Sequence, residues 1–168
     1  HDPAIGCCII VEIDGEDDAA LDTQARRMED VAKRCGVYQF RVAQSQQESD
    51  ELWAIRRGLS SAIASLVPNR LGEDISVPRD AFPEVVRRIS AIAEKHKLTI
   101  AVYGHAGDGN IHPSVLCDLS KPGEEERVHR AVEEIFDATL AVGGTLSGEH
   151  GIGITKRPYI ARALGGTG

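Results

Sequence analysis

The sequence predicts an α+β fold in which helices cover mainly one face of an antiparallel sheet, and three observations lead to this class. Short apolar runs alternate with segments whose apolar residues recur at helical spacing. Turn-forming Asp-Gly pairs, glycines and prolines separate these segments. Two β-α-β patterns follow one another along the chain, which is typical of a ferredoxin-like sandwich.

Each predicted element has a start or stop signal in the residues. Gly36 ends the first helical pattern and Pro68 follows the second, since neither residue continues a helix well. The apolar spacing predicts helices at 18–35, 49–66, 82–97 and 123–142. Apolar runs bounded by turn residues predict strands at 6–15, 37–43, 73–78, 99–103 and 111–116.

Composition and charge describe an ordinary globular chain. Of its 168 residues, 42% are hydrophobic and 27% are charged, which fits one domain with a real core. The net charge of −7 argues against a nucleic-acid surface and against a polybasic membrane patch. We expect no transmembrane segment and no signal peptide. The first residue is not Met, so we expect a piece of a longer protein.

The four cysteines indicate a reducing compartment. Cys7, Cys8, Cys35 and Cys117 show no C-x-x-C spacing, so a structural zinc site made of cysteines is not expected. The adjacent Cys7 and Cys8 lie in an apolar run and are predicted to be buried free thiols. A cytoplasmic location follows from this interpretation.

The stretch GHAGDGNIH, residues 104–112, is the most informative segment. Asp-Gly is a strong signal for a two-residue hairpin turn, and apolar runs flank it on both sides. A turn at Asp108 and Gly109 would place His105 directly opposite His112 on one face of an antiparallel pair. Two imidazoles this close can bind one metal ion.

A second glycine-rich stretch, GGTLSGEHGIG at residues 143–153, supplies further ionisable groups. Its glycines leave the backbone free to bring Glu149 and His150 to one point. Two neutral imidazoles and a carboxylate suit zinc, manganese or ferrous iron, with open positions for water or substrate. His150 is then left to move a proton as a general base.

Each of these two stretches can also be explained by a purely structural role. Asp-Gly hairpins are common in proteins that bind nothing, and the second stretch can be a helix stop followed by a turn. Two classes of protein are open on these residues. One is a metal-dependent hydrolase or lyase complete in itself, and the other is a non-catalytic binding or assembly module.

Four stretches together resemble the C-terminal domain of FAD-linked oxidases of the vanillyl-alcohol oxidase type. They are GHAGDGNIHPSVL, SGEHGIG, LWAIRRG and EDISVPR, and they extend over nearly the whole chain. That group includes the glycolate oxidase D subunit, D-lactate dehydrogenase and D-2-hydroxyglutarate dehydrogenase. The resemblance implies a flavoprotein oxidoreductase that removes hydride from a 2-hydroxy acid.

The resemblance also implies roles for individual residues. His105, His112 and Glu149 would bind a divalent metal, zinc or manganese first of all, and His150 would be the catalytic base. Arg56 would pair with the substrate carboxylate, and Ser60, one helical turn later, would touch the substrate. Asn110 is assigned to the cofactor.

Two departures from the hydroxyglutarate enzymes favour a small monocarboxylate such as glycolate or D-lactate. A lysine that holds a second carboxylate there has no clear match, because Gly72 falls at that point and Arg70 is only nearby. An asparagine two residues beyond the second metal histidine is Ser114 here.

The chain contains no glycine-rich phosphate-binding unit, so residues 1–168 are interpreted as the C-terminal substrate domain of a longer enzyme. The expected partners are the FAD-binding domain of the same full-length chain, a small 2-hydroxy acid and further oxidase subunits. Those subunits could place the enzyme at the inner membrane. The 168 residues alone are expected to be inactive.

Overall fold

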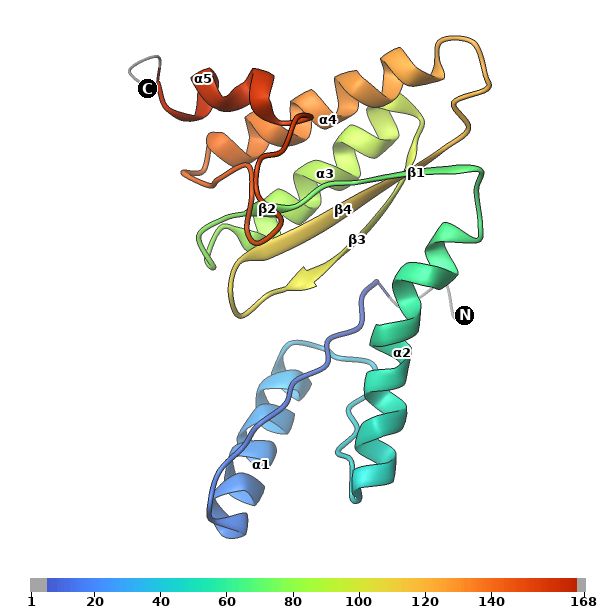
Figure 1. The fold of residues 1–168 in the computed structure, drawn as a ribbon. Helices are drawn as coiled ribbons and strands as arrows, with labels where there is room; N and C mark the ends of the chain where they lie inside the picture. Colours follow the sequence, from blue (N-terminus) through green and yellow to red (C-terminus); the bar gives the residue numbers. More distant parts are fainter. Residues whose placement is uncertain (1–5, 166–168) are drawn as a thin grey trace. The chain divides into compact units, whose positions relative to one another are not determined.

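The structure is a computed structural model that describes residues 6–165, and it divides into two compact units, 1–60 and 61–168 (Figure 1). The first unit contains α1 (Asp18–Arg34) and most of α2 (Gln46–Ala64), which continues across the boundary. Asp17 caps α1 by accepting a hydrogen bond from the backbone N–H of Ala19 at 3.0 Å. None of the described residues from 6 to 60 is buried.

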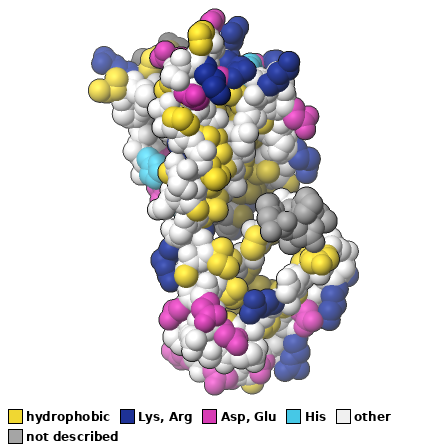
Figure 2. Space-filling view, turned by 90° about the vertical axis from the view of Figure 1, so that its right-hand side faces the viewer, with side chains coloured by type: hydrophobic (Ala, Val, Ile, Leu, Met, Phe, Trp, Pro, Cys, Tyr) yellow, Lys and Arg dark blue, Asp and Glu magenta, His cyan; other side chains and the backbone are white. Residues whose placement is uncertain are grey.

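The strands predicted at 6–15 and 37–43 are wrong. Neither segment joins a ladder in the described chain, and a strand cannot form without a partner for its backbone groups. Apolar side chains of both segments remain at the surface, where Ile9 is 73% and Tyr38 76% exposed; hydrophobic side chains are visible on the outside of the molecule in Figure 2. Cys7 and Cys8, predicted to be buried, are exposed for the same reason.

The second unit holds one antiparallel sheet built around β4 (Asn110–Cys117). β3 (Thr99–His105) pairs along one side of it. The short β1 (Asn69–Gly72) and β2 (Ile75–Ser76) pair in succession along the other side. The strand predicted at 73–78 is thus reduced to two residues, and β1 was not predicted because its sequence NRLG contains a single large apolar residue.

Two helices cover one face of this sheet, α3 (Phe82–His96) and α4 (Glu124–Leu140), as Figure 1 shows. Both follow the predicted ranges within two residues. In β4 the odd-numbered Ile111 and Val115 face the helices and are fully buried. The helices contribute apolar side chains at helical spacing to the same core, namely Val85, Ile89, Val128, Ile135 and Phe136. The predicted α+β class with helices on one face is confirmed.

The chain beyond α4 forms a loop, a short 3₁₀ helix (Arg157–Tyr159) and α5 (Ile160–Ala163). The loop joins the sheet through an isolated bridge between Thr145 and Ser76. Backbone hydrogen bonds run both ways across this bridge, at 2.7 and 3.0 Å. The glycine-rich segment is therefore anchored beside β2.

The interruption between β1 and β2 follows from Pro113 in the opposite strand. The pairs Gly72 with Ser114 and Ile75 with Ile111 keep one continuous register. Within it, the N–H of Glu73 donates to the carbonyl of Pro113 at 2.8 Å, but proline has no N–H to return the bond. The same register places Asp74 opposite His112.

The predicted two-residue turn at Asp108 and Gly109 is wrong. The register pairs His105 with Asn110 and Tyr103 with His112, so residues 106–109 form a four-residue loop. A type I′ turn needs positive φ at both central residues, whereas Asp108 does not have it and Gly109 does, at 73°. Gly109 also accepts a hydrogen bond from Val77, and a Cβ on it would lie 2.0 Å from the Val77 carbonyl oxygen.

Candidate metal centre

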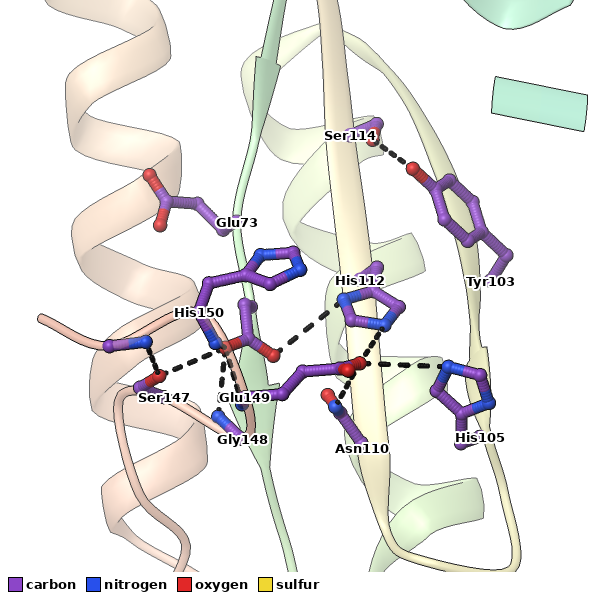
Figure 3. Close-up of polar contacts among 12 residues, drawn as sticks. Glu73, Tyr103, His105, Asn110, His112, Ser114, Ser147, Gly148, Glu149 and His150 are labelled. Carbon is purple, nitrogen blue, oxygen red and sulfur yellow. Dashed lines mark hydrogen bonds and ion pairs between the residues drawn. The ribbon is translucent and has the colours of Figure 1, made fainter. Parts of the chain in front are cut away.

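Three side chains predicted as ligands converge on the sheet face opposite the helices, which we call the site face (Figure 3). His105 ends β3, and His112 lies in the middle of β4. Their rings are perpendicular, with centroids 5.5 Å apart. Glu149 reaches both of them from the loop after α4.

The distances fit a shared cation. The Nε2 atom of His112 lies 3.0 Å from Oε1 of Glu149, and the Nε2 atom of His105 lies 3.6 Å from the same oxygen. All three ligand atoms lie within 4.8 Å of one another. Ligands at about 2.1 Å from a tetrahedral zinc ion are separated by roughly 3.4 Å, so the spacing suits such an ion. The donor set of two imidazoles and one carboxylate suits zinc or manganese.

Asn110 supports Glu149 from the same strand as His112. Its side-chain nitrogen donates to Oε1 of Glu149 at 2.8 Å. Gly148 lies so close to this amide that a Cβ would stand 2.7 Å from it. Any larger residue at 148 would push the loop or the amide aside. The structure thus gives Asn110, assigned to the cofactor from the resemblance, a contact with the carboxylate.

An open cavity of about 340 Å³ is lined by two of the three proposed ligands. Its lining includes His105 and Glu149, so a molecule in the cavity would reach the ligand atoms directly. The remaining lining residues are Ser76, Asp108, Asn110 and Gly148. A site with three protein ligands and an accessible side is typical of catalytic rather than structural metal ions.

Asp74 holds the loop that carries Glu149 and His150. Its Oδ2 atom accepts the backbone N–H groups of Gly148, Glu149 and His150 and the hydroxyl of Ser147, all at 2.8–2.9 Å. Burial alone would raise the pKa of this carboxyl group, but these donors outweigh burial and lower the pKa to about 2. Asp74 is therefore an anion that fixes the loop backbone.

Burial favours the neutral form of the His112 imidazole. Burial lowers the pKa of its imidazole, although Asp74 and Glu149 each oppose that shift. A neutral imidazole is the form that binds a metal ion. Its other nitrogen, Nδ1, lies 3.6 Å from Oδ1 of Asp74.

His150 takes a different position from the three ligands. Figure 3 shows its ring near that of His112. The two rings stack with centroids 5.3 Å apart and planes 17° from parallel, and His150 is exposed. His150, His112 and Asp74 form a second group that could hold a cation. Nδ1 of His112 lies 3.6 Å from Oδ1 of Asp74, whereas Nε2 of His112 lies 3.0 Å from Oε1 of Glu149, a residue that lines the cavity. The cavity lining includes His105 and Glu149 but neither Asp74 nor His150.

The residues tied to substrate choice fall in two places. Arg56 and Ser60 lie in α2 within the first unit, so their position relative to the histidines stays a prediction. Ser114 is fully buried in β4 and accepts a hydrogen bond from Nε of Arg70 at 3.2 Å. Arg70 also donates to the hydroxyl of Tyr103 at 2.6 Å. Gly72 pairs with Ser114 across the strands.

Sequence reasoning missed Asp74 as a functional residue. The stretch EDISVP was interpreted as a plain strand, although an acid within an apolar strand needs a partner when it is buried. That acid was the available signal. Tyr103 was also missed: its ring lies 5.6 Å from that of His112, and nothing in the run TIAVY distinguishes it.

Comparison with known protein families and with curated relatives identifies the family to which this chain belongs. The family model "FAD linked oxidases, C-terminal domain" matches residues 1–168, so the chain belongs to this family, as its motifs indicated. It is 36% identical to the glycolate oxidase subunit GlcD of Bacillus subtilis (strain 168) over 93% of this chain and 33% of that protein. It is also 36% identical to the GlcD subunit of Escherichia coli (strain K12), over 88% of this chain and 30% of that protein.

A probable mitochondrial D-lactate dehydrogenase of Danio rerio is 29% identical over 87% of this chain and 30% of its own length. The chain therefore spans about a third of the length of the curated relatives that it matches. Within the described residues, no helix is both long and apolar enough to cross a membrane.

Proposed function

We propose that this chain is the substrate-side domain of an FAD-dependent 2-hydroxy-acid oxidoreductase of the glycolate or D-lactate type. The family supports the flavin-linked class, and the printed names of the relatives support these two substrates. The observation that carries the proposal is the convergence of His105, His112 and Glu149 beside an open cavity. A hydrolase or lyase would need no flavin, whereas this family is defined by one.

The three converging side chains would hold a divalent cation, zinc or manganese. When bound, the cation lowers the pKa of a coordinated hydroxyl group, and the flavin supplies the acceptor for the hydride. The chain's own residues keep the ligands in place. Asn110 steadies Glu149, and Asp74 fixes the loop from which Glu149 and His150 project.

His150 is the proposed base that takes the hydroxyl proton. Histidine is the side chain whose charge changes most readily near neutral pH. Its exposed ring stands beside His112, and its backbone N–H is fixed by Asp74 at 2.8 Å. His150 is not a member of the group formed by His105, His112 and Glu149. His150 can thus exchange a proton without being a ligand there.

Substrate selection is assigned to Arg56 and Ser60, with Arg56 pairing with the carboxylate. A guanidinium can bind a carboxylate through two parallel hydrogen bonds, which a lysine cannot do. On the site face Arg70 is already engaged with Tyr103 and Ser114. The preference for a substrate with one carboxylate rests on Gly72 and Ser114, which stand where the hydroxyglutarate enzymes have a lysine and an asparagine.

The proposed partners follow from the length of the relatives. An FAD-binding domain in the same longer protein would supply the flavin, with Asn110 on the side that faces it, and further oxidase subunits would accept electrons. The proposed location is the cytoplasm, or the inner membrane through those subunits. The 168-residue chain alone should not turn over substrate.

Metal titration of the chain tests the ligand set. Zinc or manganese alone should bind in calorimetry, and His105→Ala, His112→Ala or Glu149→Gln should each weaken binding at least tenfold. His150→Ala should leave the affinity unchanged, and so should His129→Ala, which removes an exposed histidine from α4. Equal binding by the His105, His112 and His129 variants would contradict the metal centre.

The reaction class is tested in the longer protein that includes the flavin domain. A screen of D-2-hydroxy acids with an artificial electron acceptor should show turnover of glycolate or D-lactate that depends on the flavin. Turnover of these acids by residues 1–168 without any flavoprotein would contradict the proposal. So would an activity of the longer protein that is independent of flavin.

A further inference from the structure

The register of the sheet places Asp74 opposite His112. Asp74 lies in the interruption between β1 and β2, on the side of the backbone that belongs to the site face. Its side chain is 1% exposed and that of His112 is 8% exposed. A carboxylate and an imidazole are therefore enclosed together, away from water.

The two oxygens of Asp74 have different surroundings. Oδ2 receives four hydrogen bonds from the loop 147–150. Oδ1 has no hydrogen-bond partner among the described residues, and neither does Nδ1 of His112, which lies 3.6 Å away. This distance exceeds a hydrogen bond by a few tenths of an ångström. An ionised carboxylate can only accept, so a bond between these two atoms requires the proton on Nδ1.

The other ring nitrogen of His112, Nε2, must be unprotonated if it is to bind a metal ion. The Nε2 atom of His112 faces Oε1 of Glu149 at 3.0 Å, and that oxygen already accepts from Asn110. With the proton on Nδ1, two acceptors face each other there and attract a cation. With the proton on Nε2, the imidazole would donate to Glu149 and could not bind a metal through that nitrogen.

We propose that Asp74 is a positioning residue that fixes His112 in the Nδ1–H tautomer and thereby presents Nε2 toward Glu149 and His105. A carboxylate behind a metal-binding histidine is a recurrent way of fixing its ring and raising its basicity. The role of Nε2 as a ligand rests on the proposed function. The tautomer itself does not, because it exists without a metal.

Asp74→Asn is a sharp test because a carboxamide is not symmetric. Four donors converge on the Oδ2 position, so the amide oxygen must occupy it. The NH₂ group then faces Nδ1 of His112 and donates to it. The proton of the imidazole must consequently move to Nε2, the reverse of the native state.

The tautomer is read from the ¹⁵N shifts of the His112 ring in the labelled chain, without metal, at alkaline pH. The native chain should show Nδ1–H, and the Asn variant should show Nε2–H. Ser147→Ala is the matched control, since it removes one donor from Oδ2 of Asp74 and leaves Oδ1, the oxygen paired with Nδ1 of His112, unchanged. It should keep the native tautomer. If the Asn variant does not fold, the spectrum of the native chain still tests the proposal, because an Nε2–H tautomer of His112 in the native chain would overturn it.

Zinc affinity of the same variants gives the second measurement. Asp74→Asn should lose about 10–100-fold in affinity, the usual effect of a lost partner behind a metal ligand. Ser147→Ala should change it less than threefold. An unchanged tautomer in the Asn variant, or a switch in the Ser147 variant as well, would overturn the role of Asp74. A tautomer switch in a chain that binds no zinc supports that role and contradicts only the proposed metal centre.

Discussion

The two units contrast in what they bury. The second unit has a continuous apolar core between the sheet and α3 and α4, with several side chains fully enclosed. In the first unit none of the described residues is buried, although α1 and α2 are well-formed helices. Periodic sequence is thus sufficient to form a helix here, whereas a core needs partner surfaces as well.

A matched pair of substitutions tests this contrast most strongly. Ile89→Ala empties a fully buried position in α3 and should reduce the free energy of unfolding by about 2–5 kcal/mol. Ile55→Ala in α2 removes the same atoms from a side chain that is 67% exposed and should change it by less than about 0.5 kcal/mol. Urea denaturation of both variants measures the difference. Similar losses would show that the first unit has a core of its own.

The second prediction tests whether the first unit contributes to substrate binding through Arg56. Arg56→Ala in the flavin-containing protein should weaken substrate binding by roughly 2–5 kcal/mol, mainly as a higher KM, if the carboxylate pair is desolvated. Arg57→Ala is the control, because Arg57 donates to the Asp50 carbonyl within its own helix. Steady-state kinetics separate the two. An unchanged KM for the Arg56 variant would make Arg56 an ordinary surface charge.

The third prediction concerns acid stability of the second unit. The pKa of Asp74 is about 2 in the fold, below its usual 3.8, so the anion stabilises the native state above pH 4. The contribution is about 2 kcal/mol and disappears as the pH falls from about 4 to 2. The unfolding free energies of the native chain and Asp74→Asn should therefore approach each other over this range. A constant difference would show that ionisation of Asp74 does not stabilise the loop.

The two smallest expected changes in the free energy of unfolding come from glycine-to-alanine substitutions, and they should have opposite signs in the two units. Gly58→Ala in α2 meets no atom within 4 Å and should stabilise the chain by about 0.5–1 kcal/mol, because alanine favours a helix. Gly148→Ala meets the Asn110 amide at 2.7 Å and should cost roughly 1 kcal/mol, together with a weaker zinc affinity. Thermal unfolding and calorimetry measure both. Stabilisation by both alanines would mean that the Asn110 amide moves away without loss.

The sequence predicted the helices well because each has its own periodic pattern and stop signal. The convergence of the predicted ligands does not depend on the wrong turn, since the actual register differs from the expected one by two residues. A shift of two keeps every side chain on its face, so His105 and His112 still converge. The strands at 6–15 and 37–43 could not be decided locally, because apolar content does not provide a ladder partner. Asp74 depends on contacts with residues more than 70 positions away.

Successive side chains of β4 point to opposite faces of the sheet: Ile111 and Val115 lie in the core, and His112 and Ser114 lie on the site face. Because of this alternation, the number of residues in β4 is more tightly constrained than the identity of the side chains on its site face. Insertion of one residue within it would turn a histidine toward the helices and an apolar residue toward the site face. Stability and the proposed metal binding would then be lost together. Substitutions at even-numbered positions leave the core untouched. Divergence among relatives should therefore change side chains on the site face of β4 far more often than its number of residues.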